Sequence, residues 1–387
     1  MAAVFFAVLL AVAMRGLQLG TYEVNIKTVV QLFSGYLQIQ KVGYLDNPSL
    51  RKSFQLTNEI KEILDNEPTV IGYAPRVYAD GLISFKDNSL GTAIFGVVPQ
   101  KEKGVTNFIE KVNDGEFFKS DTSNRVVIGY KLLENLKAKI GDRIVILAQG
   151  YDGILGNLIF EISGTTKMGS GEFDNGTVFM GLSKLQELLA MEGRISAIAL
   201  STGDLDQISQ VKNKLNPLLG ESNLVALAWD EVIPELKQII QLDNVSGILM
   251  LAILVIVVAF GILNTVLMSV TERFREFGIS LAMGMPQRTL VLLVVIESVI
   301  ITLIGLILGN LVAYGVNYYI AQSPIIFGGE LAALYEDYGF LPLMKSSVKF
   351  SIFFNTSITI FIASMLSIIY PAIKVFRLEP LKGIRYT

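Results

Sequence analysis

Long uncharged apolar runs occupy most of the carboxyl-terminal part of the chain. Val245 to Val270 and Ser351 to Ile373 contain no charged residue, and Thr289 to Ile320 contains only Glu297. Each run is long enough for an α-helix to cross a hydrocarbon core of about 30 Å. The pattern therefore predicts a protein of the lipid bilayer. We place three transmembrane helices at residues 244–270, 289–320 and 350–375.

The amino-terminal segment is apolar as well. Met1 to Met14 carries no charged side chain before Arg15, but as a helix it would span only about 21 Å. We place a first transmembrane helix at residues 1–19 and expect it to be truncated, with a native amino terminus that is longer. A cleaved signal peptide is the alternative, because Ala11 to Ala13 resembles a cleavage site, although no basic stretch precedes it.

Residues 20–243 have the composition of a globular region and the length of one or two packed domains. Apolar alternation and β-branched residues predict strands at Tyr36 to Gln40, Leu82 to Phe85, Thr92 to Val98, Arg125 to Ile128, Arg143 to Ala148, Leu158 to Ser163 and Thr177 to Met180. Helical patterns occur at Pro48 to Leu64, Tyr130 to Ala138, Ser183 to Met191 and Asp204 to Leu215. We expect Asn47 to cap the first of these helices, and Ser183 with Gln186 to form a capping box.

The distribution of basic residues predicts the topology. The loop 271–288 and the tail 376–387 are rich in arginine and lysine, which marks the cytoplasmic side of a membrane. Residues 20–243 and the loop 321–349 then lie outside. The expected fold class is membrane α-helical, with four transmembrane helices and a large α+β extracytoplasmic domain between the first and second helices. The expected location is the bacterial inner (plasma) membrane, with several passes through it.

Composition excludes most kinds of catalytic chemistry. Hydrophobic residues make up 51% of the 387 and charged residues 17%, and the chain has neither Cys nor His. Thiolate nucleophiles, imidazole bases and the usual zinc ligands are therefore missing. Residues 20–243 hold 22 Lys and Arg against 28 Asp and Glu, which does not favour nucleic acid as a partner. Gly164 to Gly171 lacks the Lys and Ser/Thr order of a nucleotide-binding loop. We expect no enzymatic activity and no cofactor, with ATP bound by a separate subunit.

The cytoplasmic loop reads TERFREFGISLAMGMP from Thr271 to Pro286. Its apolar and small residues follow the spacing of one helical face, and its charged residues lie off that face. We expect a short amphipathic helix within residues 271–288, ended by Pro286. Such a helix either rests in the lipid interface or docks its apolar face in a groove of a cytoplasmic partner. The pattern alone leaves both alternatives open.

Three segments carry a family resemblance. The loop residues Glu272, Arg273, Glu276 to Ile279 and Ala282 to Met285 resemble the signature of FtsX-like, MacB-superfamily ABC transporter permeases. Val126 to Gly129, followed by Lys139 to Arg143, resembles the MacB-like periplasmic core. Arg377 to Leu381, with the residues up to Tyr386, resembles the carboxyl-terminal tail of that family. Ser34 to Ile39 most resembles the LolC/LolE type, whose members release lipoproteins. Residues 244–387 would then be the FtsX-like permease domain.

The resemblance implies a function. A permease of this family dimerises with a second copy, as a homodimer or heterodimer, and pairs with ATP-binding subunits that move its outer domains. It implies lipoprotein release or transport, with MacB-type drug or peptide efflux, or FtsX-type mechanotransmission to a cell-wall hydrolase, as alternatives. A periplasmic carrier or adaptor is a further possible partner. A membrane-anchored sensor or receptor is a hypothesis of a different class, although the short loop and tail leave no room for a signalling domain.

The resemblance also assigns a docking site for the ATPase subunit to the loop helix, with Phe277 as an anchor in the partner's pocket. The expected docking residues are Glu272, Arg273, Phe274, Glu276, Phe277, Gly278, Leu281, Ala282 and Gly284.

Several residues within the spans are unusual for a membrane. Glu297 is either a functional site or lies near enough to the inner surface to meet water, Arg288 or a partner helix, and we favour the second explanation. The Gly305 and Gly309 pair permits close helix packing, possible at a dimer interface. We expect Asn264 and Asn310 to form hydrogen bonds between spans, and Pro371 to end or bend the fourth span.

Overall fold

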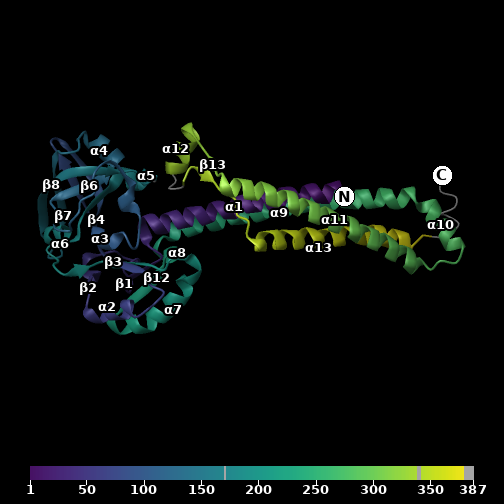
Figure 1. Ribbon diagram of the computed structural model, residues 1–387, viewed down its shortest axis with the longest axis horizontal. Helices are drawn as coiled ribbons and strands as arrows, with labels where there is room; N and C mark the ends of the chain where they lie inside the picture. The colour runs from purple at the N-terminus through teal and green to yellow at the C-terminus, as the bar shows by residue number, and fades with distance from the viewer. Residues whose placement is uncertain (170, 338–340, 379–387) are drawn as a thin grey trace. The chain divides into compact units, whose positions relative to one another are not determined.

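The computed structural model describes residues 1–169, 171–337 and 341–378 (Figure 1). The tail residues 379–387, which carry part of the family resemblance, lie outside the described residues. The chain divides into two compact units. The helical unit comprises Met1–Val24, Ile239–Ile326 and Leu343–Thr387, and the α+β unit comprises Asn25–Gln238 and Phe327–Pro342.

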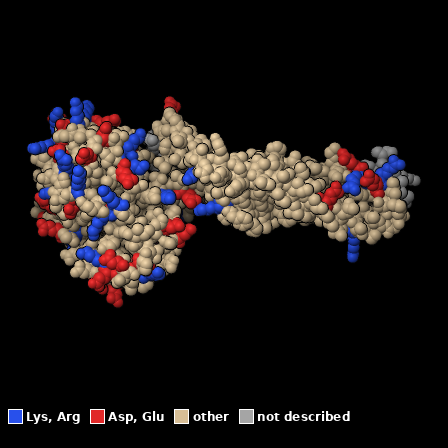
Figure 2. All heavy atoms as spheres, in the orientation of Figure 1, with Lys and Arg blue, Asp and Glu red and all other residues tan. Residues whose placement is uncertain are grey.

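Four helices in the described part of the chain are long and apolar enough to cross a membrane. They are α1 (Ala2–Val29, extended by a π-helical turn, Val30–Ser34), α9 (Pro234–Glu272), α11 (Gln287–Gln322) and α13 (Phe350–Phe376). The middle of the helical unit shows no Lys, Arg, Asp or Glu on the face in Figure 2, and charged residues gather towards its ends. This arrangement agrees with a charge-free belt at the level of the hydrocarbon core.

The first helix continues well beyond the boundary at residue 19 that the sequence suggested. Arg15 does not interrupt it, because its Nη1 donates a hydrogen bond of 2.6 Å to Oε1 of Gln18, one turn further along. The Gln18 amide in turn donates to the carbonyl oxygen of Asp243 in α9, at 2.8 Å. Arg15 and Gln18 therefore have polar partners within the helical unit, and the helix runs on through Val29.

Close packing of α1 against α11 uses the glycine pair in α11. A Cβ atom added at Gly305 would lie 2.9 Å from the Cβ of Val4, and one at Gly309 would lie 2.8 Å from the Cβ of Val8. Only glycine lets the two backbones approach so closely. The pair therefore serves a contact within one chain, which corrects the idea that it lies at a dimer interface.

The α+β unit is built on a ten-stranded mixed sheet, in the order β12-β1-β11-β3-β4-β9-β6-β8-β5. The strands are β1 (Leu37–Lys41), β3 (Gly72–Phe85), β4 (Asn88–Val97), β5 (Val112–Gly115), β6 (Arg125–Gly129), β7 (Arg143–Gln149), β8 (Leu155–Thr166), β9 (Thr177–Gly181), β11 (Ala197–Ser201) and β12 (Leu224–Ala228). Strand β7 pairs with both β3 and β8, and this closes six strands into a ring: β3, β4, β9, β6, β8 and β7. Pairs β4–β9 and β6–β8 are parallel, and the other pairs in the ring are antiparallel.

Helices and short strands complete both units. The helices are α2 (Asn58–Asp65), α3 (Pro99–Glu102), α4 (Tyr130–Leu136), α5 (Gly171–Gly176), α6 (Leu182–Leu188), α7 (Ile208–Leu219), α8 (Trp229–Val232), α10 (Phe274–Ala282) and α12 (Gly329–Asp337). The short strand pairs are β2 (Phe54–Gln55) with β10 (Arg194–Ile195), and β13 (Ile325–Ile326) with β14 (Leu343–Met344).

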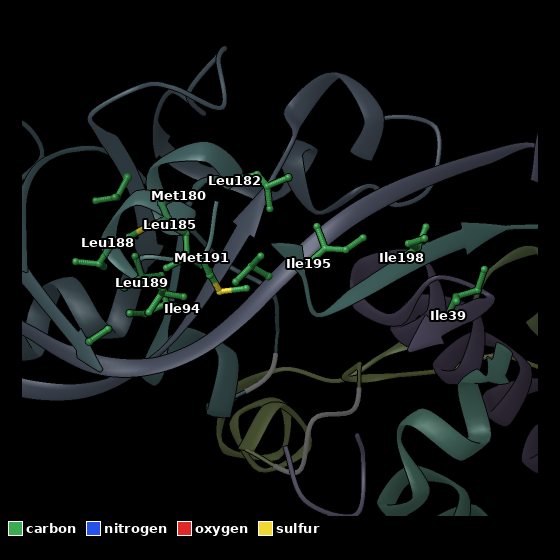
Figure 3. Close-up of a cluster of buried hydrophobic side chains, with 14 of the residues drawn as sticks. Ile39, Ile94, Met180, Leu182, Leu185, Leu188, Leu189, Met191, Ile195 and Ile198 are labelled. Atoms are coloured by element: carbon green, nitrogen blue, oxygen red, sulfur yellow. The ribbon is translucent and has the colours of Figure 1, made fainter. Parts of the chain in front are cut away.

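One buried apolar cluster takes side chains from all six strands of the ring. Leu185, Leu188 and Leu189, from α6 and the residue after it, join Ile94 and Met180 in this cluster (Figure 3). Five of the seven expected strands lie within observed ones, and the other two overlap β1 and β4 but begin at Tyr36 or end at Val98, one residue outside. Alternation locates a strand because it follows from burying one of its faces.

Two local expectations in this unit are wrong. Residues 48–64 do not form one helix, because β2 pairs with β10 and interrupts it; α2 begins later and is capped by Thr57, whose Oγ1 accepts from the N–H of Ile60 at 3.4 Å. Ser183 forms no capping box with Gln186. Its hydroxyl donates instead to the Asp121 carboxylate at 2.7 Å, and the Gln186 amide donates to the carbonyl oxygen of Arg194.

A buried ion pair ties the start of the sheet to the end of the first helix. Arg76 on β3 forms a bidentate pair with Glu102, with both N–O distances 2.7 Å, and both side chains are fully buried. Arg76 Nη1 also donates to the carbonyl oxygen of Phe33, in the π-helical turn after α1. Burial by itself lowers the pKa of the Arg76 guanidinium, but the charge of Glu102, together with the hydrogen bonds to Glu102 and Tyr78 and the nearby Tyr78 oxygen, raises the pKa above its usual value, so Arg76 stays charged.

Removing the carboxylate should destabilise the α+β unit strongly. Glu102→Ala leaves the Arg76 charge buried without its partner, and we expect the free energy of unfolding to fall by about 3–5 kcal/mol. The single tryptophan, Trp229, packs against the core of this unit, so its fluorescence in denaturant reports the loss.

The matched control is Glu161→Ala. It removes a carboxylate 3.3 Å from Arg125, where both side chains are largely exposed. The expected loss is about 1 kcal/mol or less. Equal losses in the two variants would contradict a special role for the buried pair.

Candidate functional site

Helix α10 forms a turn between two membrane-spanning helices, and local chemistry sets both of its ends. Arg273 leaves helical geometry between α9 and α10. At the other end, Gly284 has a φ of +96°, a left-handed conformation that glycine adopts without strain. Pro286 then precedes α11 and fits the start of that helix. The loop 271–288 thus contains the expected amphipathic helix, but the helix itself is nine residues long.

The inner face of α10 packs against the chain's own spans. Phe274 and Phe277 are buried in a cluster with residues of α9, α11 and α13, namely Val270, Leu290, Val294, Val375 and the adjoining Leu378. Gly278 is also buried, and Leu281 packs against the same cluster. Phe277 is only 3% exposed. This corrects the expectation that Phe277 enters a partner's pocket, because its own chain already encloses its ring.

The outer face of α10 is open. Ile279 is 44% exposed and Met283 is 77% exposed, and the two lie four residues apart, so they are neighbours on one helical face. Arg275 lies one turn before Ile279 on the same face. Four of the expected docking residues are exposed in the structure: Glu272, Glu276, Ala282 and Gly284. Ile279 and Met283 were not among the residues expected to matter on this helix, although their spacing of four indicates a second apolar stripe.

Arg273 links the turn to the next span. Its Nη1 lies 2.9 Å from Oε2 of Glu297 in α11, and its Nε lies 3.2 Å from Oε2 of Glu276 in α10. The hydrogen bond to Glu276, with the nearby charge of Glu297, raises the pKa of Arg273. Its guanidinium carbon is 5.3 Å from the ring centroid of Phe277. Glu297 therefore forms an ion pair with an arginine, as one of the two interpretations of the sequence predicted. The partner is Arg273 and not Arg288.

A small cavity adjoins this pair. It measures about 70 Å³, and polar side chains of α9 and α11, including Thr265, Ser269, Ser298 and Thr302, line part of it. A cavity of this size and polarity can hold water. Among the residues that the structure describes, no group of three or more acidic side chains could hold a metal ion.

The other polar residues of the spans have separate environments. Asn310 Nδ2 donates to Ser357 Oγ of α13 at 2.8 Å, which confirms the expected hydrogen bond between spans. Asn264 is exposed on α9, and its side chain forms no hydrogen bond within the described part of the chain. Pro371 does not end the fourth span, because α13 continues to Phe376. Asn317 was missed: its buried Nδ2 donates to the carbonyl oxygen of Val12 in α1 at 3.2 Å.

Two family models match the chain. The MacB-like periplasmic core domain matches residues 1–218, more than half of the chain, and the FtsX-like permease C-terminal domain matches residues 248–380.

Individual relatives have low sequence identity to this chain, but the matches extend over most of its length. The chain is similar to the lipoprotein-releasing system transmembrane protein LolC of Neisseria meningitidis serogroup B, with 19% identity over 356 residues that cover 89% of this chain and 84% of LolC. It is also similar to the macrolide export ATP-binding/permease protein MacB of Acinetobacter baylyi, with 24% identity over 309 residues that cover 76% of this chain but 44% of MacB. The chain therefore spans less than half the length of that export protein.

A solved structure is similar to part of the chain. The extracellular domain of the noncanonic ABC-type transporter YknZ from Gram-positive bacteria matches with 15% identity and a TM-score of 0.37, covering 49% of this chain and 98% of that domain. The family assignment depends on the sequence models, one of which spans more than half of the chain and the other the helices on both sides of α10. This chain belongs to the FtsX/MacB/LolC family of ABC transporter permeases.

Proposed function

We propose that this chain is the permease subunit through which a separate ATP-binding subunit drives motion of the α+β unit, and that its outcome is lipoprotein release or transport. The observation that carries the proposal is the division of α10 into two faces. The inner face joins three spans in one apolar cluster, and the outer face presents Ile279 and Met283 to a partner.

The docking surface that we propose consists of Ile279 and Met283, surrounded by Glu272, Arg275 and Glu276. Exposed apolar side chains at the centre of a contact and charged ones at its rim are the usual arrangement of a protein interface. A methionine adapts its shape to a pocket more readily than a branched side chain does. In this proposal the chain binds no nucleotide or cofactor, and the ATP-binding subunit carries out hydrolysis.

The membrane arrangement follows from charge. Arg273, Arg275 and Arg288 all lie in or beside the α10 turn, and basic residues flank spans on the cytoplasmic side. We therefore propose that α10 lies in the cytoplasm and the α+β unit outside, in the inner membrane of a bacterium. A second permease copy, and a carrier or adaptor outside the membrane, are further proposed partners.

The cargo that we propose is a lipoprotein. The match to LolC extends over most of both chains, and this supports release of lipoproteins. Efflux of a drug or peptide is the second candidate, and the match to MacB supports it. Mechanotransmission to a cell-wall hydrolase and a sensor role have less support, because neither rests on a specific contact or relative.

Changing the outer face of α10 should release the ATP-binding subunit. Ile279→Asp places a charge at the centre of the proposed contact, so we expect copurification of the ATP-binding subunit to fall at least tenfold, with membrane insertion unchanged. The matched control is Val42→Asp, at an apolar side chain of the α+β unit that is similarly exposed (53% against 44%). Retention of the subunit by Ile279→Asp at the wild-type yield would refute the docking assignment.

Breaking the link between α10 and α11 should uncouple the two subunits without separating them. In Glu297→Gln we expect the ATP-binding subunit to copurify normally, while ATP hydrolysis by the reconstituted complex falls by about fivefold. Because both residues serve one contact, the double variant Arg273→Gln with Glu297→Gln should be no worse than either single variant. Additive losses would show that the two residues act separately.

The cargo can be tested in the host cell. Depletion of this chain should leave outer-membrane lipoproteins in the inner-membrane fraction after density-gradient separation, with resistance to macrolides unchanged. The reverse result, normal lipoprotein sorting with increased drug sensitivity, would favour efflux. The Ile279→Asp variant should reproduce the effect of depletion in either case, so the docking site and the cargo are tested independently.

A further inference from the structure

A second feature of the helical unit lies between α11 and α13. The two helices leave an apolar groove between them, of about 440 Å³, near the end that carries α10. Val291 and Val295 line it from α11, and Ile369, Ala372, Ile373 and Phe376 line it from α13. The volume falls within the range of about 300–1,000 Å³ that is typical of small-molecule sites. The lining side chains have no group that could bind a polar ligand, so the groove suits a hydrocarbon chain.

Two arginines lie at the end of this groove. Arg288 precedes Val291 by three residues and Val295 by seven, which places it on the groove face of α11. Arg377 directly follows Phe376 and lies one turn after Ile373. The ends of the two helices are joined, because Gln287 Nε2 donates to the carbonyl oxygen of Leu378 at 3.4 Å. Both arginines therefore lie at the same end of the groove.

These arginines differ from Arg273 in their surroundings. Arg273 forms ion pairs with Glu276 and Glu297, whereas neither Arg288 nor Arg377 forms an ion pair within the described ranges. Both are exposed. Exposed arginines at the end of a span extend towards the lipid headgroups, where a phosphate is the complementary charge. Basic sites between spans on the cytoplasmic side of a membrane bind anionic headgroups in this way.

We propose that the groove between α11 and α13 is a binding site for an anionic phospholipid, with an acyl chain against Val295 and Ala372 and the phosphate bound by Arg288 and Arg377. Ala372 is the smallest of the lining residues and leaves room for the chain. Val375 and Leu290, in the cluster that holds the inner face of α10, are close in sequence to the lining residues Phe376 and Val291. A bound lipid would therefore support the spans that carry α10. The inference does not depend on the proposed ATP-binding partner.

The test compares two lipids with the same acyl chains. The full chain, purified in mild detergent, is titrated with dioleoyl phosphatidylglycerol or dioleoyl phosphatidylcholine, and bound lipid is counted by native mass spectrometry. We expect the anionic lipid to bind more tightly by about fivefold for each arginine. Arg288→Gln with Arg377→Gln should remove this preference and leave phosphatidylcholine binding unchanged. Ala372→Phe should weaken the binding of both lipids, because the added ring fills the groove.

Arg275→Gln is the matched control, since Arg275 is an exposed arginine at the same end of the helical unit but on α10. It should keep the full preference for the anionic lipid. An equal loss of preference in Arg275→Gln would reduce the effect to general charge attraction and overturn the proposal. Competition by inorganic phosphate alone, at the concentrations at which the lipid binds, would also overturn it, because the acyl chain would then contribute nothing.

The groove variant separates a lipid from a second copy of the chain. Ala372→Phe should leave the oligomeric state unchanged in size-exclusion chromatography with light scattering, while lipid binding falls. A change of oligomeric state with normal lipid binding would identify the groove as a contact between copies and refute the lipid assignment. The arginine variants alter only exposed side chains, so they keep the test decisive if Ala372→Phe does not fold.

Discussion

The close contact between α1 and α11 holds the helical unit together. Residues spaced by four meet along both helices: Val4, Val8, Val12 and Gly16 on α1, and Gly305, Gly309, Ala313 and Asn317 on α11. Within a membrane there is no hydrophobic driving force between helices, so small residues and buried hydrogen bonds must supply the association. Here glycine brings the backbones together, and Asn317 adds a hydrogen bond to the carbonyl oxygen of Val12. The same cluster also includes Ile262 of α9 and Ile360 of α13.

The sequence predicted that these residues pack, but not what they pack against. A glycine pair predicts close approach of two helices and cannot tell a neighbour in the same chain from one in a second chain. The same limit applies to α10. Its apolar spacing correctly indicated a buried face, but Phe274 and Phe277 are buried by Val270, Val294 and Val375 of their own chain. Periodicity identifies a face that avoids water, and only the tertiary structure shows which surface covers it.

In the α+β unit, exposure of one strand face explains only part of which strands were predicted. Strand β7 alternates between buried and partly exposed residues, and its position was predicted from that pattern. All five residues of β11 are buried, and this strand was missed. Strand β9 is also buried throughout but was predicted from its β-branched and apolar residues, whereas β12 alternates and was missed. The expected helix at residues 48–64 failed because β2 pairs with β10, about 140 residues away in the sequence, and no local signal records that pairing. The closed ring of six strands likewise depends on β7 pairing with both β3 and β8.

The two faces of α10 connect the exposed residues of the turn to the neighbouring spans. Phe274 and Phe277 join it to α9, α11 and α13 in one cluster, and Arg273 adds a charged link to Glu297. Close-packed side chains transmit displacement with little compression. In the proposed docking role, a force on Ile279 and Met283 would therefore reach three spans through this cluster. Had Phe277 pointed outward to bind a partner, the turn would lose one of the two aromatic rings that hold it to its own spans. The exposed residues Ile279 and Met283 are available to a partner, and the buried residues Phe274 and Phe277 fix the helix to its own spans.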